Sequence, residues 1–311
     1  MKNFLKRLFG QTQPTHRPEP EETSTPTDNT PDPSPLVSDV NAVVVSDLGN
    51  VRANNEDTGL FVRLADEGLR RVKGYLLLVA DGMGGHLAGE VASQMAAEIV
   101  SRDYFQHHDT IEKSLVRAFQ IANRQIYEEA KQHPTFRGMG TTCTAVVVQN
   151  QQLYYAHVGD SRAYLFKHGQ LIQMTEDHTY VQELLRSGEI TEQAAATHPE
   201  RNVLTQAMGT KADLRIDLGR CILPFDPGDR LLLCSDGLYE YCREADLVRM
   251  LSHGSLMEAA DELVKMAKAR GGHDNITVVV AERTSVGVEA EPRETREIEL
   301  PLTRDIEISN D

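Results

Sequence analysis

Five aspartates stand where an apolar run of the sequence begins, ends or turns. They are Asp57, Asp81, Asp160, Asp236 and Asp274. Two of them follow the apolar runs 75–80 and 230–235, two precede the runs 58–64 and 275–282, and Asp160 lies between the runs 152–158 and 162–168. Such runs indicate buried strands. In an antiparallel sheet the end of one strand lies beside the start of its neighbour. Two strand ends, two strand starts and one hairpin turn can therefore meet at one edge.

Carboxylates gathered at one edge repel one another strongly unless cations neutralise them. Ligand sets made only of oxygen select hard divalent ions such as Mg²⁺ or Mn²⁺. Gly82 directly follows Asp81, and its backbone carbonyl can add an oxygen ligand because no side chain stands in the way. One such aspartate alone is more often a turn residue, but five at one edge indicate a metal site.

Arg52 precedes Asp57 by five residues, on the approach to the same edge. An arginine beside metal-bound oxygens is a natural bidentate partner for a phosphate. A salt bridge to Glu56 or Asp57 is the structural alternative, and the spacing leaves both interpretations open.

The composition divides the chain into three parts. Residues 1–37 comprise a short basic amphipathic start and a linker rich in Pro, Thr, Glu and Asp, which we expect to be disordered. Residues 38–283 contain no comparable break and are predicted to form one domain. Residues 284–311 form an acidic tail, also expected to be disordered.

Within 38–283, helical periodicity is clearest over 91–99, 115–126 and 256–267. The predicted strands are 42–47, 58–64, 74–80, 143–149, 152–158, 162–168, 229–235 and 275–282. Many strands follow one another directly, and the helices come in pairs between groups of strands. This order favours antiparallel sheets flanked by helices over a doubly wound parallel sheet.

Charge and composition exclude several classes of protein. The net charge of −15 argues against a general nucleic-acid binder. The four cysteines form no CxxC pair, which indicates reduced thiols in a cytoplasmic protein. No stretch approaches the roughly 18 apolar residues of a membrane span. The first ten residues lack the apolar core of a secretory signal.

Six segments occur in an order that resembles a known family. They are RANNED (52–57), ADGMGGH (80–86), GMGTTCTA (138–145), VGDSRAY (158–164), CSDGLYE (234–240) and GGHDNITVVV (271–280). Together they resemble the metal-dependent serine/threonine protein phosphatases of type 2C, in their bacterial form, over roughly residues 40–283. Each segment alone is a weak signal, whereas the ordered set is specific. Residues 174–191 resemble the segment before and within the flap beside the family's active site.

The resemblance implies an α+β fold, a four-layer α-β-β-α sandwich with two antiparallel sheets. It also implies two Mn²⁺ or Mg²⁺ ions and a role for each matching residue. Asp81 would bridge the two ions, with the Gly82 carbonyl on one and Asp236 and Asp274 on the other. Glu56 and Asp57 would act mostly through metal-bound water, Asn275 would support Asp274, Arg52 would hold the phosphate, and Asp160 and Glu240 match a weaker third metal site.

The implied reaction is hydrolysis of phosphoserine and phosphothreonine in proteins, which would reverse the action of a bacterial serine/threonine kinase. Two metals roughly 4 Å apart share a water, and the resulting hydroxide attacks phosphorus without a phosphoenzyme. In agreement, the sequence has no CxxxxxR loop of the kind that cysteine phosphatases use. Two positions depart from the family. Met83 stands where some members have a histidine, and Glu240 stands where aspartate is common.

The alternative function is that of an inactive relative that serves as a regulatory binding module. The presence of Arg52 and of every implied aspartate argues against it. Phosphorylated proteins and a cognate kinase are the expected partners. The repeated tail segments at Thr295 and Thr303 resemble the ligands that forkhead-associated domains bind once the threonine is phosphorylated. The alternative is a chance repeat in an acidic tail. Residues 1–10 predict weak membrane contact at most.

Overall fold

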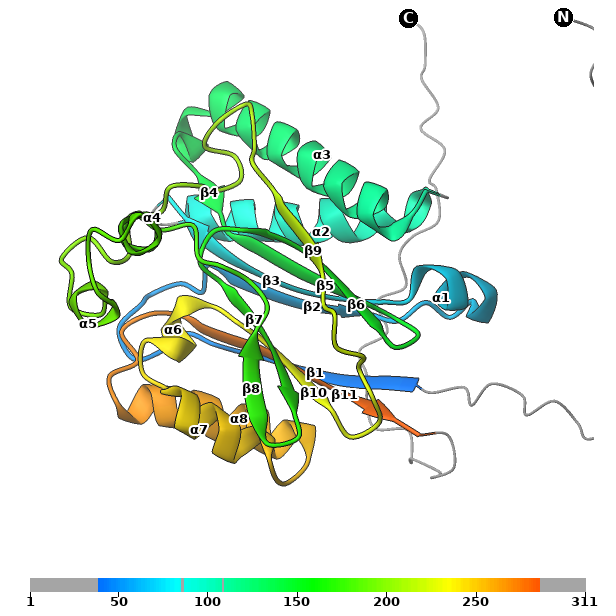
Figure 1. Ribbon diagram of the computed structural model, residues 1–311. Helices are drawn as coiled ribbons and strands as arrows, with labels where there is room; N and C mark the ends of the chain where they lie inside the picture. Colours follow the sequence, from blue (N-terminus) through cyan, green and yellow to red (C-terminus); the bar gives the residue numbers. More distant parts are fainter. Residues whose placement is uncertain (1–38, 85–86, 108, 286–311) are drawn as a thin grey trace, which may run out of the picture. The chain divides into compact units, whose positions relative to one another are not determined.

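Two antiparallel sheets stacked face to face form the centre of the protein, as the computed structural model shows (Figure 1). The structure describes residues 39–84, 87–107 and 109–285. The predictions for the linker, for the first ten residues, for Thr295 and Thr303 and for nearly all of the acidic tail lie outside these residues.

Sheet A contains, in spatial order, β1 (Asp39–Asp47), β11 (Ile276–Thr284), β10 (Arg230–Cys234), β7 (Arg162–Lys167) and β8 (Gln170–Gln173). Sheet B contains β2 (Asp57–Val62), β3 (Tyr75–Met83), β5 (Cys143–Gln149), β6 (Gln152–Val158) and β9 (Asp217–Arg220). The short β4 (Gly140–Thr141) pairs with the end of β3. All of these pairings are antiparallel, as expected from the order of elements.

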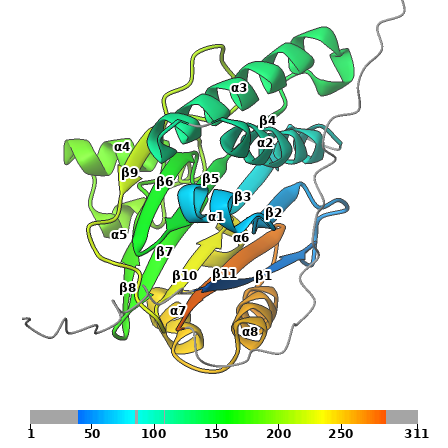
Figure 2. The ribbon, with the colours of Figure 1, turned by 90° about the vertical axis from the view of Figure 1, so that its right-hand side faces the viewer.

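Helices cover the outer face of each sheet. The pair α2 (Leu87–Gln106) and α3 (Ile111–Gln132) covers sheet B, and the pair α7 (Glu244–Leu251) and α8 (Leu256–Ala269) covers sheet A (Figure 2). The remaining helices are short. They are α1 (Glu67–Lys73), η1 (Pro134–Phe136), α4 (Tyr180–Ser187), α5 (Glu192–Ala195) and α6 (Asp236–Tyr239). None of the helices within the described ranges is long and apolar enough to cross a membrane.

Three apolar layers hold the sandwich together, and β3 shows why its sequence is apolar without interruption. Leu76 and Leu78 pack toward α2 and α3, whereas Leu77 and Val79 pack between the two sheets. A strand buried on both faces carries apolar residues at successive positions. The third layer lies between sheet A and the helices α7 and α8. The predicted four-layer α-β-β-α sandwich is thus confirmed.

The turn at Asp160 corrects one expectation. It is not a hairpin turn, because it connects β6 of sheet B to β7 of sheet A. Gly159 permits this crossing with φ = +107°, and a Cβ there would lie 2.5 Å from the side chain of Thr142. Glycine is the residue that tolerates both the positive φ and the close approach. Asp160 therefore lies at the junction between the sheets.

Candidate active site

The five aspartates meet at one end of the sandwich and come from both sheets. In sheet B, Asp57 at the start of β2 lies opposite Asp81 near the end of β3. In sheet A, Asp236 follows β10 and Asp274 precedes the neighbouring β11. The argument from strand ends and strand starts therefore holds within each sheet. We call this end of the sandwich the acidic edge.

Burial first, and then the repulsion between neighbouring charges, raises the pKa values of four carboxyl groups at the acidic edge. Burial raises the pKa of Asp81 well above its usual value, and the charges of Asp57, Asp236, Asp160 and Asp274 raise it further. Burial, followed by the charges of Asp160 and Asp274, has the same effect on the pKa of Asp236. Burial also raises the pKa of Asp57 to about 6 and that of Asp160 to about 7. Such a group of carboxylates is stabilised by any cation that binds beside it.

One oxygen at the edge has no hydrogen-bond partner among the described residues. Asp236 Oδ1 is buried and accepts no hydrogen bond. A buried carboxylate oxygen without a donor is costly unless a cation satisfies it. Oxygen donors and excess negative charge match the requirements of a hard divalent ion. The residues at the acidic edge therefore fit the metal ions that the sequence implied.

The carboxylates do not yet surround one point as ligands. In the part of the chain that the structure describes, no group of three His, Cys, Asp or Glu side chains is arranged to hold an ion. Asp274 has partners at both oxygens, because Oδ2 accepts from Arg52 NH2 at 2.6 Å and Oδ1 accepts from the Asn275 amide at 2.8 Å. The expected alternative for Arg52 was a salt bridge to Glu56 or Asp57, but its ion-pair partner is Asp274.

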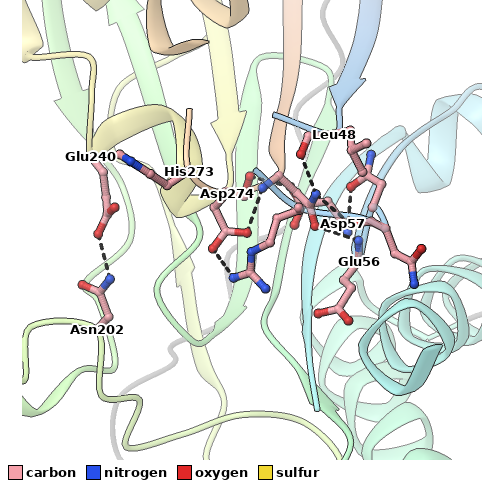
Figure 3. A network of polar contacts seen from close by, with 12 residues as sticks. Leu48, Glu56, Asp57, Asn202, Glu240, His273 and Asp274 are labelled. Carbon is pink, nitrogen blue, oxygen red and sulfur yellow. Dashed lines mark hydrogen bonds and ion pairs between the residues drawn. The ribbon is translucent and has the colours of Figure 1, made fainter. Parts of the chain in front are cut away.

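Asn275 fixes the loop that precedes β2 against the start of β11. Its Nδ2 donates to the carbonyl oxygens of Leu48 and Asn54, both at 3.0 Å, and its Oδ1 accepts from the Glu56 amide at 2.8 Å (Figure 3). The side chain is buried. Asn275 thereby holds the loop that carries Arg52 and Glu56 next to Asp274.

Gly82 lies where three backbone segments come together. Its amide donates to the Glu56 carbonyl at 3.0 Å, and a Cβ built at Gly82 would lie 2.0 Å from the carbonyl oxygen of Gly89. No side chain fits at this position. The buried Glu56 carboxylate lies close to Gly89, the residue whose carbonyl oxygen approaches Gly82. Its Oε2 lies 2.7 Å from a Cβ built on Gly89.

Two hydroxyl residues that the sequence analysis did not assign hold the aspartates in place. Ser235 Oγ donates to Asp57 Oδ2 at 2.7 Å. Thr142 binds the backbone of Asp81 on both sides, because its Oγ1 accepts from the Asp81 amide at 2.9 Å and its amide donates to the Asp81 carbonyl at 2.8 Å. Both residues belong to segments that carried the resemblance, CSDGLYE and GMGTTCTA. Their partners are distant in sequence, so only the fold reveals them.

Glu240 follows α6 and contacts the loop that follows α5. It accepts a hydrogen bond from Asn202 Nδ2 at 2.8 Å (Figure 3). Arg201 NH2 lies 3.5 Å from the same carboxylate. Its charge contributes to the raised pKa values of Asp160 and Asp236. The structure thus places both residues expected at a third metal site, Asp160 and Glu240, at the acidic edge.

Comparison with known proteins shows which family the chain resembles in sequence and in fold. The family model for protein phosphatase 2C matches residues 64–277. The serine/threonine phosphatase stp of Listeria innocua is 40% identical over 244 residues, which cover 76% of this chain and 94% of that protein. A serine/threonine phosphatase of S. agalactiae is 34% identical, with a TM-score of 0.71 over 78% of this chain and 99% of that one. The PstP catalytic domain in complex with two manganese ions is 35% identical, with a TM-score of 0.68 over 79% of this chain and 99% of that one.

Proposed function

The chain belongs to the protein phosphatase 2C family and is a metal-dependent serine/threonine protein phosphatase, and we propose that its acidic edge is the catalytic centre. The observation that carries this proposal is the meeting of five aspartates from two sheets beside an arginine. The catalytic domain would comprise residues 38–283, with its last strand reaching Thr284.

We assign the metal ligands to the acidic edge. Asp81 and the Gly82 carbonyl would hold one ion, and Asp81, Asp236 and Asp274 would hold the other. When bound, two such ions lower the pKa of a shared water and stabilise negative charge on phosphoryl oxygens. The two manganese ions in the related PstP structure support Mn²⁺, and the oxygen ligands suit Mg²⁺ equally. Asp160 and Glu240 would hold a weaker third ion.

Arg52 would bind the phosphate of the substrate. Its side chain is 47% exposed, so its guanidinium can turn from Asp274 to an incoming anion without crossing the core. The planar guanidinium can donate two parallel hydrogen bonds to phosphate oxygens. Since Arg52 and Asp274 share a hydrogen bond, the phosphate would be held directly beside the metal ligands.

The other residues of the edge would orient water and support the ligands. Glu56 and Asp57 bring two more carboxylates to the edge, the first close to Gly89 and the second held by Ser235. Met83 offers no proton, so we propose that solvent water protonates the leaving oxygen. Asn275 keeps Asp274 and the Arg52 loop together.

We propose phosphoserine and phosphothreonine proteins in the cytoplasm as substrates and a bacterial serine/threonine kinase as the opposing enzyme. The names of the relatives support the substrate class. The alternative function, a binding module without activity, is not favoured, because Arg52 and the three metal-binding aspartates are present and adjacent.

The test is hydrolysis of a phosphothreonine peptide with Mn²⁺, with Mg²⁺ and with excess chelator. Wild type should turn over only with metal, and Asp236→Asn should lose about a thousandfold in kcat because it removes a ligand charge. The exposed Asp213 lies outside the edge, so Asp213→Asn is the matched control and should keep full activity. If neither metal supports turnover, the alternative function, a binding module without activity, is favoured instead.

A further inference from the structure

Arg162 contacts three side chains next to the acidic edge, and the proposed function uses none of these contacts. It is the first residue of β7 and follows Asp160 by two positions. Its guanidinium binds Asp177 through two of its nitrogens, Nε to Oδ1 at 2.9 Å and NH2 to Oδ2 at 2.7 Å. Its Cζ lies 3.7 Å from the centre of the Tyr239 ring, and NH1 donates to Tyr164 Oη at 3.2 Å.

Two of these partners belong to elements that carry residues of the edge. Tyr239 lies in α6 three residues after Asp236, which is about one helical turn. Asp177 precedes His178, whose amide donates to the Gly159 carbonyl at 2.7 Å and whose Nδ1 accepts from the Gly159 amide at 3.1 Å. The Asp177 segment is therefore bonded to the turn that carries Asp160, and Arg162 connects this segment to α6.

The positive charge of Arg162 also lies beside the carboxylates of the acidic edge. Its side chain is 26% exposed and that of Asp177 is 10% exposed, so solvent screens the pair only partly. Without Arg162, Asp177 would become one more uncompensated acid beside Asp160, and Tyr239 would lose the group that packs on its ring.

We propose that Arg162 is a positioning residue of this phosphatase: by holding Asp177 and Tyr239 it fixes the Asp160 turn and the helix that begins at Asp236, and so sets the affinity of these carboxylates for metal. The inference rests on the proposed function. Residues that orient metal ligands from behind typically change metal affinity 10- to 100-fold when they are replaced.

The loss of a purely structural ion pair would lower stability without changing metal affinity. The neighbouring strand β10 offers such a pair as a matched example. Arg230 of β10 is 12% exposed, pairs with Glu282 at 3.1 Å and donates to the Leu251 carbonyl at 3.1 Å. It lies at the other end of β10 from Asp236. Arg230→Met therefore serves as the control for lost stability.

A pocket beside Arg162 permits a second, chemical test. It has a volume of 290 Å³ and is lined by Arg162, Tyr164, Tyr239 and residues of β8 and α7. Methylguanidinium is smaller than this volume and carries the lost functional group. In Arg162→Ala, millimolar methylguanidinium should restore part of the metal affinity, whereas methylammonium should restore less because it cannot form the two-nitrogen contact with Asp177.

The experiment measures Mn²⁺ binding by calorimetry and the Mn²⁺ dependence of phosphopeptide hydrolysis for the full chain. Arg162→Met should weaken Mn²⁺ binding about tenfold or more. Arg162→Lys should fall between Arg162→Met and wild type. Arg230→Met should lower the unfolding temperature and change Mn²⁺ affinity less than about twofold.

The outcomes separate the two proposals. If wild type binds Mn²⁺ and a folded Arg162→Met binds it equally well, the positioning role is wrong and the proposed function stands. If Arg162→Met does not fold, Arg162→Lys and the methylguanidinium comparison decide, and unchanged affinity in both contradicts the positioning role. If wild type neither binds Mn²⁺ nor hydrolyses the peptide, the proposed function fails and this inference fails with it.

Discussion

Strand β7 connects two groups of aspartates whose charges are neutralised in different ways. Its first residue, Arg162, stands at the acidic edge, and its last residue, Lys167, stands at the opposite end. Lys167 is 8% exposed and donates to Asp229 at 2.6 Å and to Asp226 at 2.7 Å. The aspartates at this end have a cation supplied by the chain itself.

At the acidic edge the chain leaves much of the negative charge uncompensated. Asp236 Oδ1 accepts no hydrogen bond from the residues that the structure describes, and burial together with the surrounding carboxylates raises the pKa values of Asp81 and Asp236. Acids paired within the chain contribute to the fold, whereas acids held together without enough counter-charge indicate a site for an external cation. Substitutions at the two ends should therefore have opposite effects.

The largest effect on activity is expected for Asp81→Asn. Because Asp81 is the proposed bridge between the ions, kcat with Mn²⁺ should fall by about a thousandfold or more. The metal-free protein should become more stable, since one repelling carboxylate is gone. Peptide hydrolysis and urea unfolding with chelator measure the two effects. Normal turnover, or a less stable metal-free protein, would show that Asp81 has a structural role like that of Asp229.

The opposite result is expected for Lys167→Met. This change removes the lysine that pairs with the buried Asp229 and leaves only the weaker influence of the nearby Arg283, so it should cost about 3 kcal/mol of unfolding free energy. Turnover per folded molecule should remain close to that of wild type, because Lys167 lies at the far end of β7. Urea unfolding and peptide hydrolysis at low temperature test this. The exposed pair of Lys265 and Glu262 provides the control, since Lys265→Met should leave stability unchanged. A loss of turnover with stability intact would contradict the comparison.

The sequence predicts the acidic edge well, for a simple physical reason. A carboxylate directly after a buried apolar run, as at Asp81 and Asp236, must lie where a strand leaves the core. Because neighbouring strands are antiparallel, the same edge receives the residues that precede the next strands, as the pairing of Asp57 with Asp81 shows.

The sequence does not predict the contacts that hold this edge together. The hydrogen bond from Arg52 to Asp274 joins residues 222 positions apart, and the bond from Ser235 to Asp57 joins residues 178 positions apart. The predicted hairpin at Asp160 was wrong for a related reason, because local patterning does not reveal that the two strands belong to different sheets. The edge strands β8 and β9 were missed, since four residues carry too little alternation to be recognised.

A smaller effect is expected from pH on the metal-free protein. The pKa values of Asp57 and Asp160 are raised to about 6 and about 7, above their unfolded values, so the folded state binds more protons and loses stability as pH rises. The fall in stability should be clearest between about pH 6.5 and 8. At lower pH the buried His157, whose pKa is lowered to about 3, binds fewer protons in the folded than in the unfolded state, so it makes stability rise with pH. Thermal unfolding with chelator should show a falling midpoint across this window, and Mn²⁺ should remove the fall. Asp160→Asn should make the metal-free slope shallower, and a midpoint that rises with pH in the metal-free protein would contradict the account.

The smallest effect is expected for Glu240→Gln, which tests where the acidic edge ends. The Glu240 side chain is 21% exposed and contacts Asn202 and Arg201, so its charge is partly screened and partly compensated. Glutamine keeps an acceptor for Asn202 and removes only the charge, and exposed ion pairs contribute below about 1 kcal/mol. Turnover at saturating Mn²⁺ should change less than about fivefold, since 1 kcal/mol corresponds to about fivefold. The Mn²⁺ concentration needed for full activity should rise if Glu240 binds the third ion. A loss of turnover near that of Asp236→Asn would place Glu240 among the main metal ligands. An unchanged Mn²⁺ dependence would limit its role to the contacts with Asn202 and Arg201.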